Sequence, residues 1–536
     1  MIQVLYYYHS DGFRFRIKEL TFQKPGEFER TNNMEVEKAV TPTLLVMTVS
    51  LMAGLWYWLQ KKPHPKFPPG PKGWPIIGNM LDFVSIGPHH LFMSLAEKYG
   101  NVFSMKIGAH WNVILNGSET IKEALIKYPV EFAGRPHTFS SDIFTEGGKD
   151  IAFSQYTPTW KLHRKLAHTA FRTLATGNNE KFENLVFGVT EKVGKMLTDK
   201  GSEQFDPKNI ISLAVYNFIA QMVFGKQYEL DDPDLIEWRS LSQESIEVFG
   251  NGLMADFFPI MQYFPSSGVR GLHDLMARFL KLLNDEIARH KETYNPDEEP
   301  KDVVEMLFKA RQDMIDSGEE GIDKISETHL KMTVFDIFSA GTDTSIFTLQ
   351  WAVACLVDFP EVQEKVQKEI DDVIGSGRLP KMDDRGTLPY TESTLYEVFR
   401  YSSITPLTLP HATTKDVNFG GYFIPKGTWI LPNVYSMHFD KKLWGDPENF
   451  RPEHFLNETG TMRQHPEGFL PFSTGRRVCL GESVAKAELF LIFTWLFQNF
   501  SFKKPAGKEK EVYSFVDKTA LTPVLKGYEV IVTKRS

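Results

Sequence analysis

The sequence predicts a mainly α-helical fold with a minor β-sheet component. Apolar residues recur every three or four positions over most of the 536-residue chain, as in helices that bury one face. Short runs rich in β-branched and aromatic residues lie between these stretches. No linker divides the chain after residue 75, so we expect residues 76–536 to form one catalytic domain.

The composition narrows the class of protein. Hydrophobic residues make up 42% of the chain, enough for a large core. The net charge of -8 gives no overall basic footprint for nucleic acid, so no nucleic-acid partner is expected. Two cysteines cannot build a disulfide framework, which fits a reducing compartment.

Residues 1–39 form an N-terminal segment. Residues 1–33 match neither a targeting sequence nor a recognisable structural element, and Met34 would make a natural start. Our hypothesis is that residues 1–33 are an extension that need not exist in the native protein.

Residues 40–60 are predicted to form a single transmembrane anchor. Residues 40–59 carry no charge, and about twenty apolar residues are needed to cross a bilayer. Aromatic residues at 56–58 suit the membrane interface, and the lysines that follow place the large C-terminal part in the cytoplasm. A cleaved signal peptide is the alternative, but no small-residue cleavage site stands out.

Residues 61–75 are basic and rich in proline. Because proline fixes φ and resists both helix and sheet, we expect a stiff hinge between the anchor and the catalytic domain.

Within the catalytic domain, the apolar periodicity predicts helices over residues 90–99, 120–127, 179–198, 207–224, 272–294, 327–356, 360–374, 391–401 and 482–500. A hairpin is predicted over 102–107 and 111–115 around Gly108. Further strands are predicted near residues 413–419, 428–431 and 528–533.

The first stretch with chemical character is residues 472–481, Phe-Ser-Thr-Gly-Arg-Arg-Val-Cys-Leu-Gly. Glycines allow a backbone to approach a flat ligand closely. A helix that begins just after Cys479 would direct its N–H groups at a negatively charged sulfur. A small buried hydrophobic cysteine is the alternative reading.

The second stretch is residues 331–350, a predicted buried helix interrupted by Ala340-Gly341-Thr342-Asp343-Thr344. A glycine, together with a threonine hydroxyl that bonds back to the preceding turn, would open the helical ladder locally and leave room for water or dioxygen. The acid and the hydroxyl would then deliver protons. Alternatively, Gly341 admits a close helical neighbour and Thr344 only bonds its own backbone.

Two further constellations carry charge. Glu397 and Arg400 lie three residues apart on one helical face and can form an ion pair. Trp160 and Arg164 offer an indole N–H and a guanidinium, which are good donors for carboxylate oxygens.

Taken together, these motifs resemble those of the cytochrome P450 family. Phe472, Gly475, Arg477, Cys479 and Gly481 match the haem-ligand loop F-x-x-G-x-R-x-C-x-G at each fixed position. The resemblance implies haem b, with Cys479 as the axial thiolate ligand of its iron.

The resemblance also assigns roles elsewhere in the chain. Residues 340–345 match the oxygen-binding motif A-G-x-[DE]-T-[TS], in which Thr344 and Asp343 would supply protons. Trp160, Arg164 and Arg477 would bind the haem propionates. The family completes its E-x-x-R pair with an arginine in a P-E-R-F stretch, and His454 takes that place here.

The implied activity is a monooxygenase that inserts one oxygen atom from O2 into a lipophilic substrate. Electrons would come from NADPH through the membrane-bound NADPH–cytochrome P450 reductase, with cytochrome b5 as a further partner. The protein would be a single-pass protein of the endoplasmic reticulum membrane. A peroxide-rearranging haem-thiolate isomerase and a non-catalytic haem-binding protein are the alternatives from other classes.

Within the family, residues 134–136 and 481–498 look most like steroid 17-alpha-hydroxylases and neighbouring xenobiotic-oxidising families. The substrate would then be a steroid, or a broader range of xenobiotics. Asp343 stands where steroid hydroxylases commonly carry Glu, which weakens a narrow steroid assignment. The pocket is expected to be lined by Phe139, Ile143, Phe144, Ala340, Gly341, Ile404, Thr405, Leu521, Thr522 and Val524.

Overall fold

The computed structural model describes residues 47–50, 54, 61–85, 87–177, 179–229, 231–251, 253–264, 266–463, 466–514 and 525–535. The chain divides into two units, Met1–Leu59 and Gln60–Ser536. The predicted extension 1–33 and nearly all of the predicted anchor 40–60 lie outside the described residues. Among the described helices, none alone has the length and apolarity of a membrane span. The two consecutive helices Glu327–Asp358 and Pro360–Val373 reach that length and apolarity only when they are taken together, and the chain bends by 108° between them.

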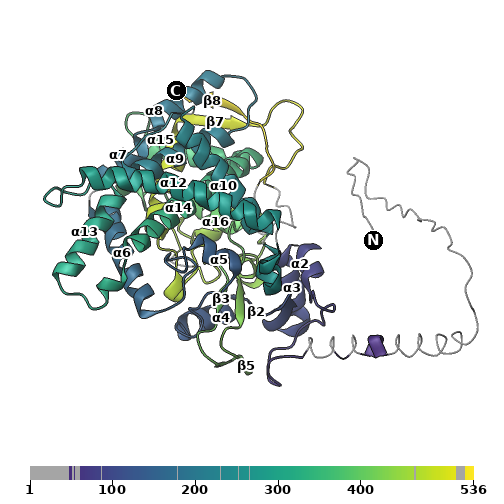
Figure 1. Ribbon diagram of the computed structural model, residues 1–536. Coiled ribbons are helices and arrows are strands. Elements are labelled where there is room, and N and C mark those ends of the chain that lie inside the picture. Colours follow the sequence, from purple (N-terminus) through teal and green to yellow (C-terminus); the bar gives the residue numbers. More distant parts are fainter. Residues whose placement is uncertain are drawn as a thin grey trace, which may run out of the picture. The chain divides into compact units, whose positions relative to one another are not determined.

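Helices dominate the second unit, as predicted (Figure 1). They are α2 (Met80–Ser85), α3 (Pro88–Tyr99), α4 (Ser118–Lys122), α5 (Phe139–Phe144), α6 (Pro158–Gly177), α7 (Asn179–Phe187), α8 (Thr190–Lys200), α9 (Lys208–Phe224), α10 (Pro233–Asn251), α11 (Met254–Phe257), α12 (Ser267–Thr293), α13 (Val303–Asp316), α14 (Glu327–Asp358), α15 (Pro360–Val373), α16 (Pro389–Ser402), α17 (Tyr435–His438), α18 (Lys441–Trp444) and α19 (Glu482–Asn499). Short π and 3-10 segments are η1 (Glu123–Lys127), η2 (Pro259–Tyr263), η3 (Ile322–Lys324), η4 (Met382–Asp384), η5 (Pro452–Phe455) and η6 (Gly475–Arg477).

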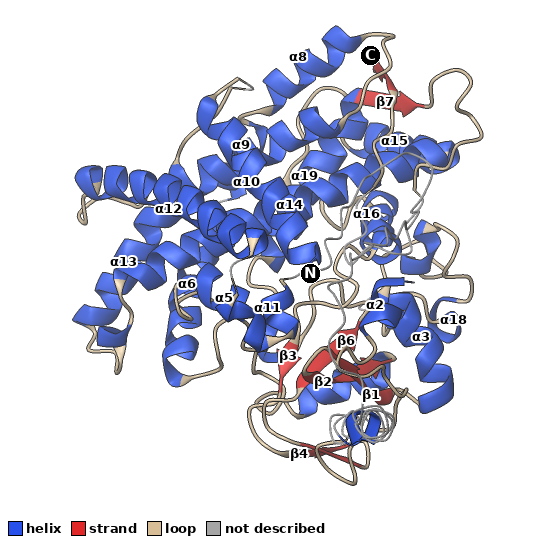
Figure 2. Cartoon of the chain, turned by 45° about the vertical axis from the view of Figure 1, so that its right-hand side comes forward, coloured by secondary structure: helices blue, strands red, loops and turns tan. Residues whose placement is uncertain are grey.

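The main sheet has four strands in the order β1-β2-β6-β3. Its strands are β1 (Val102–Ile107), β2 (His110–Asn116), β3 (His411–Ala412) and β6 (Trp429–Asn433). Smaller ribbons pair β4 (Val417–Phe419) with β5 (Tyr422–Ile424), and β7 (Phe500–Lys503) with β8 (Ile531–Lys534). Figure 2 shows the main sheet at the end of this unit opposite β7.

Most of the predicted elements are confirmed, with some corrections. The hairpin around Gly108 forms with Val102 opposite Leu115. The predicted helix 179–198 is two helices, α7 and α8, and the predicted strand 413–419 is strand only from Val417. Helix α19 ends at Asn499, where β7 takes over. Helices α10 and α13 were not predicted.

The proline-rich segment 61–75 packs against the sheet. The Pro69 carbonyl accepts a hydrogen bond from Ser104 N of β1 at 2.6 Å, and Phe67 is buried. A Cβ on Gly70 would lie 1.7 Å from the Ser104 carbonyl oxygen, so only glycine fits there. The segment predicted as a hinge is therefore docked onto β1.

The core of this unit is built around α14. Buried residues of α9, α14, α16 and α19 belong to one hydrophobic cluster. Gly341 of α14 faces α9, where a Cβ would lie 3.1 Å from Ile219 Cδ1. This contact matches the alternative reading of Gly341, in which the glycine admits a close neighbour.

Candidate functional site

The loop between η6 and α19 presents Cys479. Its backbone N–H donates to the Phe472 carbonyl at 3.0 Å, which closes the loop. Gly475 has a φ of 75°, and a Cβ there would lie 2.2 Å from the Leu125 carbonyl oxygen. The loop therefore needs glycine at this position to pack against η1.

Cys479 lies at the accessible surface of its loop, whereas Cys355 is buried in the core. Desolvation of the thiol by the loop atoms around it raises the pKa of Cys479. The N–H groups of Gly481 and Glu482 and the charge of Arg164 act in the opposite direction. These groups would stabilise a thiolate once a cation is bound to the sulfur.

Arg477 lies under the indole of Trp160, with its guanidinium carbon 4.0 Å from the ring centroid. It donates hydrogen bonds to the carbonyls of Ala133, Ile151 and Ser154 at 2.8, 3.1 and 2.6 Å. Trp160 Nε1 donates to the Ile151 carbonyl at 2.9 Å. A contact of these two residues with haem propionates stays a prediction.

Arg135 and Arg164 complete a cluster of three arginines. Arg164 donates to the Val478 carbonyl next to Cys479 at 2.5 Å, and Arg135 is buried. Burial and the charges of Arg135 and Arg164 lower the pKa of Arg477 to about 8. Asp150, whose own pKa is raised by burial, is the acid that opposes them.

This donor set fits haem. Positive charge is concentrated beside the cysteine loop, and a group bearing two carboxylates would neutralise it. A Cβ on Gly481 would meet no described protein atom within 4 Å, so that side of the loop is open to a flat ligand. The place of Arg135 in this cluster was not predicted, although Arg135 lies in the stretch 134–136 that resembles the steroid hydroxylases.

Helix α14 is open to solvent at one point along its length. Ala340 is exposed in the middle of an otherwise largely buried helix. Thr344 Oγ1 donates back to the Ala340 carbonyl at 2.8 Å, as expected. The expected local opening is not seen as a break, because α14 is helical from Glu327 to Asp358.

Asp343 is held by a neighbouring helix, whereas the Thr344 hydroxyl bonds within α14. Asp343 Oδ1 accepts a hydrogen bond from Ser242 Oγ of α10 at 2.5 Å. Burial raises the pKa of Asp343 to about 6, and the Ser242 hydrogen bond and the charge of Lys208 oppose this rise. The carboxyl group is therefore poised to exchange a proton near neutral pH.

Asp336, one turn before Ala340, was missed in the sequence. It accepts hydrogen bonds from the backbone N–H groups of Ile151 and Ala152 at 2.7 and 3.3 Å. Since the Ile151 carbonyl accepts from Arg477, Asp336 links α14 to the arginine cluster.

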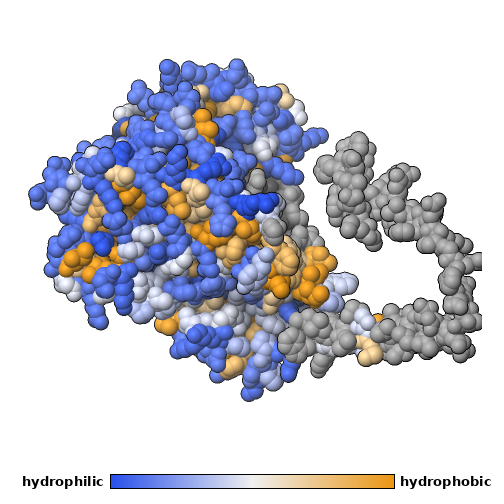
Figure 3. Space-filling view, in the orientation of Figure 1, coloured by the Kyte–Doolittle hydropathy of each residue, from blue (hydrophilic) through white to orange (hydrophobic). Residues whose placement is uncertain are grey.

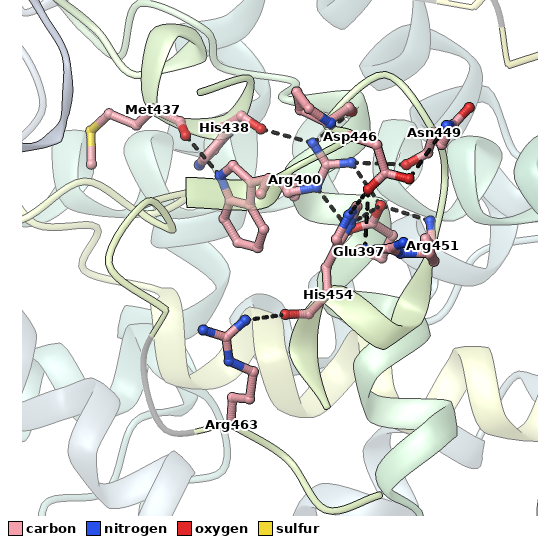
Figure 4. A network of polar contacts seen from close by, with 11 residues as sticks. Glu397, Arg400, Met437, His438, Asp446, Asn449, Arg451, His454 and Arg463 are labelled. Atoms are coloured by element: carbon pink, nitrogen blue, oxygen red, sulfur yellow. Dashed lines mark hydrogen bonds and ion pairs between the residues drawn. The ribbon is translucent and has the colours of Figure 1, made fainter. Parts of the chain in front are cut away.

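The predicted Glu397–Arg400 pair is fully buried (Figure 4). Arg400 Nε and Nη2 donate to the two Glu397 carboxylate oxygens at 2.8 and 2.7 Å. His454 takes the third place, with Nδ1 3.1 Å from Glu397 Oε1 and Nε2 3.0 Å from Asp446 Oδ1. Both ring nitrogens of His454 therefore lie against carboxylate oxygens, one inside the pair and one from Asp446.

The residues predicted to line the substrate pocket differ in their exposure to solvent. Phe144 is buried in the core, whereas Phe139, Ile143 and Ile404 are half-buried. Thr405, like Ala340, is exposed. The predicted residues Leu521, Thr522 and Val524 lie outside the described part of the chain.

The cysteine loop, the arginine cluster and the exposed Ala340 of α14 form the arrangement expected of a haem-thiolate protein. The sequence model of the cytochrome P450 family matches residues 68–528, and the chain belongs to this family. It is therefore a cytochrome P450 monooxygenase.

Similar proteins include a steroid hydroxylase and two cytochromes P450 whose names give no substrate. Steroid 17-alpha-hydroxylase/17,20 lyase of Ictalurus punctatus is 37% identical over 444 residues, covering 82% of this chain and 86% of that protein. Cytochrome P450 1A1 of Canis lupus familiaris is 34% identical over 493 residues, covering 89% and 93%. Cytochrome P450 2D3 of Rattus norvegicus is 33% identical over 480 residues, covering 88% and 93%.

Glu488 of α19 was not singled out from the sequence. It is buried against α14, where Ser345 Oγ donates to its Oε2 at 3.0 Å. Its Oε1 has no hydrogen-bond partner among the described residues. Burial raises the pKa of Glu488 to about 8, so the carboxyl is held neutral at pH 7.

Replacing Glu488 by Gln is expected to stabilise the protein in mildly alkaline solution. A carboxyl whose pKa is raised in the folded state lowers stability as the pH climbs from its unfolded pKa to the folded one. The thermal midpoint of Glu488→Gln should therefore match the wild type at about pH 4 and exceed it by several degrees at about pH 8. Thermal unfolding of the haem-loaded protein across this range measures the effect. Glu320→Gln, on an exposed loop, is the control, and parallel pH curves for Glu488→Gln and wild type would contradict the interpretation.

Proposed function

We propose that this P450 hydroxylates a steroid. The observation that carries this proposal is the 37% identity to a steroid 17-alpha-hydroxylase/17,20 lyase, which extends over 82% of the chain. Electrons would come from NADPH through a flavoprotein reductase, with cytochrome b5 as a further donor.

The proposal assigns one role to each set of residues in the site. Cys479 ligates the iron, while Trp160, Arg164 and Arg477 hold the propionates. When bound, the haem supplies electron transfer and oxygen activation. The chain's own residues orient the substrate beside Ala340, exclude water, and move protons through Asp343 and Thr344.

Membrane attachment is supported by an exposed apolar surface. Figure 3 shows apolar atoms over the region labelled α2 and α3 in Figure 1. The segment around α11 contacts the turn between β1 and β2, where Ala109 N donates a hydrogen bond to the Phe257 carbonyl at 2.8 Å. Large exposed apolar residues of both segments are Trp74, Ile76, Leu81, Met254, Ile260, Met261, Tyr263 and Phe264. A patch of this kind fits contact with a bilayer, here the endoplasmic reticulum membrane, from which a lipophilic substrate would enter.

A broad-specificity xenobiotic oxidase is the second candidate, because residues 134–136 and 481–498 also resemble xenobiotic-oxidising families. The chain is likewise 34% identical to cytochrome P450 1A1 over 89% of its length. The two functions separate in a screen of the purified protein with reductase against pregnane steroids and planar aromatics, with products identified by mass spectrometry. We expect steroid hydroxylation and a steroid-induced spectral shift. Shifts and products with planar aromatics alone would discard the steroid assignment.

The proton relay is tested by Thr344→Ala. We expect the variant to keep its haem spectrum and consume NADPH, but to form at least about tenfold less product per NADPH, because a positioned proton donor is lost. Thr348→Ala is the matched control, since Thr348 also bonds back to a carbonyl of α14 and is buried. Equal coupling in Thr344→Ala and wild type would exclude the relay.

A further inference from the structure

Helices α10 and α14 are joined by an aromatic contact and by a hydrogen bond. Trp238 of α10 packs on Phe338 of α14, with ring centroids 4.4 Å apart. One turn further along α10, Ser242 donates its hydrogen bond to Asp343. Asp343 is thus held by a helix other than its own, 101 residues away in the sequence.

Other groups surround this bond on α9 and α10. The hydroxyl of the buried Tyr216 of α9 interacts with Ser242, and the charge of Asp343 contributes to raising the pKa of Tyr216 after burial. Lys208 at the start of α9 lowers the pKa of Asp343, and Arg239 of α10 lowers that of Tyr216. Basic charge thus favours the ionised form of Asp343.

Ser242 is partly accessible to solvent. The residue is half-buried, like Asp343, whereas Tyr216 is buried and Lys208 is exposed. A hydroxyl both donates and accepts, so it can give its proton to the carboxylate while it takes another from a water molecule. That water regains its proton from bulk solvent, so the net change is one proton moved from solvent to the carboxylate and no charge remains on the serine.

We propose that Ser242 is a positioning residue that holds Asp343 and connects it to solvent, so that proton supply to Thr344 requires α10 to be docked on α14. This inference rests on the proposed role of Asp343 and Thr344. Helix α10 leads into the exposed apolar segment around α11 and η2. Proton supply is thereby tied to the helix next to the proposed route of substrate entry.

The test compares Ser242→Ala with wild type as full-length haem-loaded enzyme. Infrared difference spectra across a pH titration of the resting enzyme, assigned with Asp343→Asn, follow the Asp343 carboxyl directly. Because the serine hydrogen bond favours the carboxylate, its loss should move the titration midpoint upward by about one pH unit. Product per NADPH should fall by about threefold or more, since the route to water is lost.

Two variants sharpen the result. Ser242→Thr keeps the hydroxyl and should restore both the midpoint and the coupling. Ser240→Ala should change neither, because Ser240 bonds Glu244 on its own helix at 3.0 Å. An unshifted midpoint with normal coupling in Ser242→Ala would overturn the inference.

Failure of the inference and failure of the proposed relay give different results. If Asp343→Asn and Thr344→Ala are uncoupled but Ser242→Ala is normal, only the role of Ser242 is excluded. If Asp343→Asn and Thr344→Ala also couple normally, the relay itself is excluded.

Discussion

Arg400→Ala is expected to give no folded, haem-loaded protein. Arg400 is fully buried and donates to Glu397 and to the carbonyls of His438, Pro447 and Asn449 (Figure 4). Truncating it leaves the Glu397 carboxylate buried without its cation, which costs about 3–5 kcal/mol. That loss is a large part of the stability of a typical protein.

The yield of haem-bound protein and its thermal midpoint measure this effect. Arg400→Lys should fail as well, because one ammonium cannot replace the planar fork that serves four groups. Arg451→Ala is the matched control, since its side chain is half exposed and pairs with Asp446 at the surface. We expect a cost of less than about 1 kcal/mol there. Normal yield and stability of Arg400→Ala would show that the buried pair is dispensable.

Elements with long or strict periodicity were predictable from the sequence. The β1–β2 hairpin follows from its alternation around Gly108, which has a φ of 59°. The prediction of one helix over 179–198 failed because the chain bends at Gly188, where a Cβ would lie 3.1 Å from the Gln221 side chain of α9. Such a packing constraint is not visible in local periodicity.

Helices α10 and α13 were missed for a related reason. Trp238 of α10 is buried between Phe224 of α9 and Phe338 of α14, so tertiary contacts fix this helix. Helix α13 lies between the charge-rich stretches 297–302 and 316–320, whose composition favours loops. Its N-cap is Asp302, which accepts a hydrogen bond from Glu305 N. A single N-cap residue is weak evidence for a helix in a sequence.

In the candidate site, too, residues within sequence motifs were predictable, whereas contacts between distant segments were not. Cys479, Gly475 and the Glu397–Arg400 pair belong to contiguous motifs, so their residue types and spacing could be read directly. Partners that packing brings close from distant parts of the chain could not be predicted from the sequence. Ser242 reaches Asp343 and Glu488 reaches Ser345 across 101 and 143 residues.

The proposed function depends first on a thiolate that Cys479 supplies to haem iron. Serine has nearly the same shape but its hydroxyl does not ionise as a thiol does, so Cys479→Ser removes the ligand with little change in packing. The arginine cluster remains in that variant, and in the proposed site it would still hold the propionates. We therefore expect a haem-containing protein without turnover.

The absorption spectrum of the reduced protein under carbon monoxide tests this claim most directly. Wild type and Cys355→Ser, the variant of the buried cysteine, should both show the strongly red-shifted Soret band of thiolate ligation. Cys479→Ser should lack this band and form no product. A red-shifted band that persists in Cys479→Ser, or that is absent from the wild type, would contradict the assignment of Cys479 as the haem ligand.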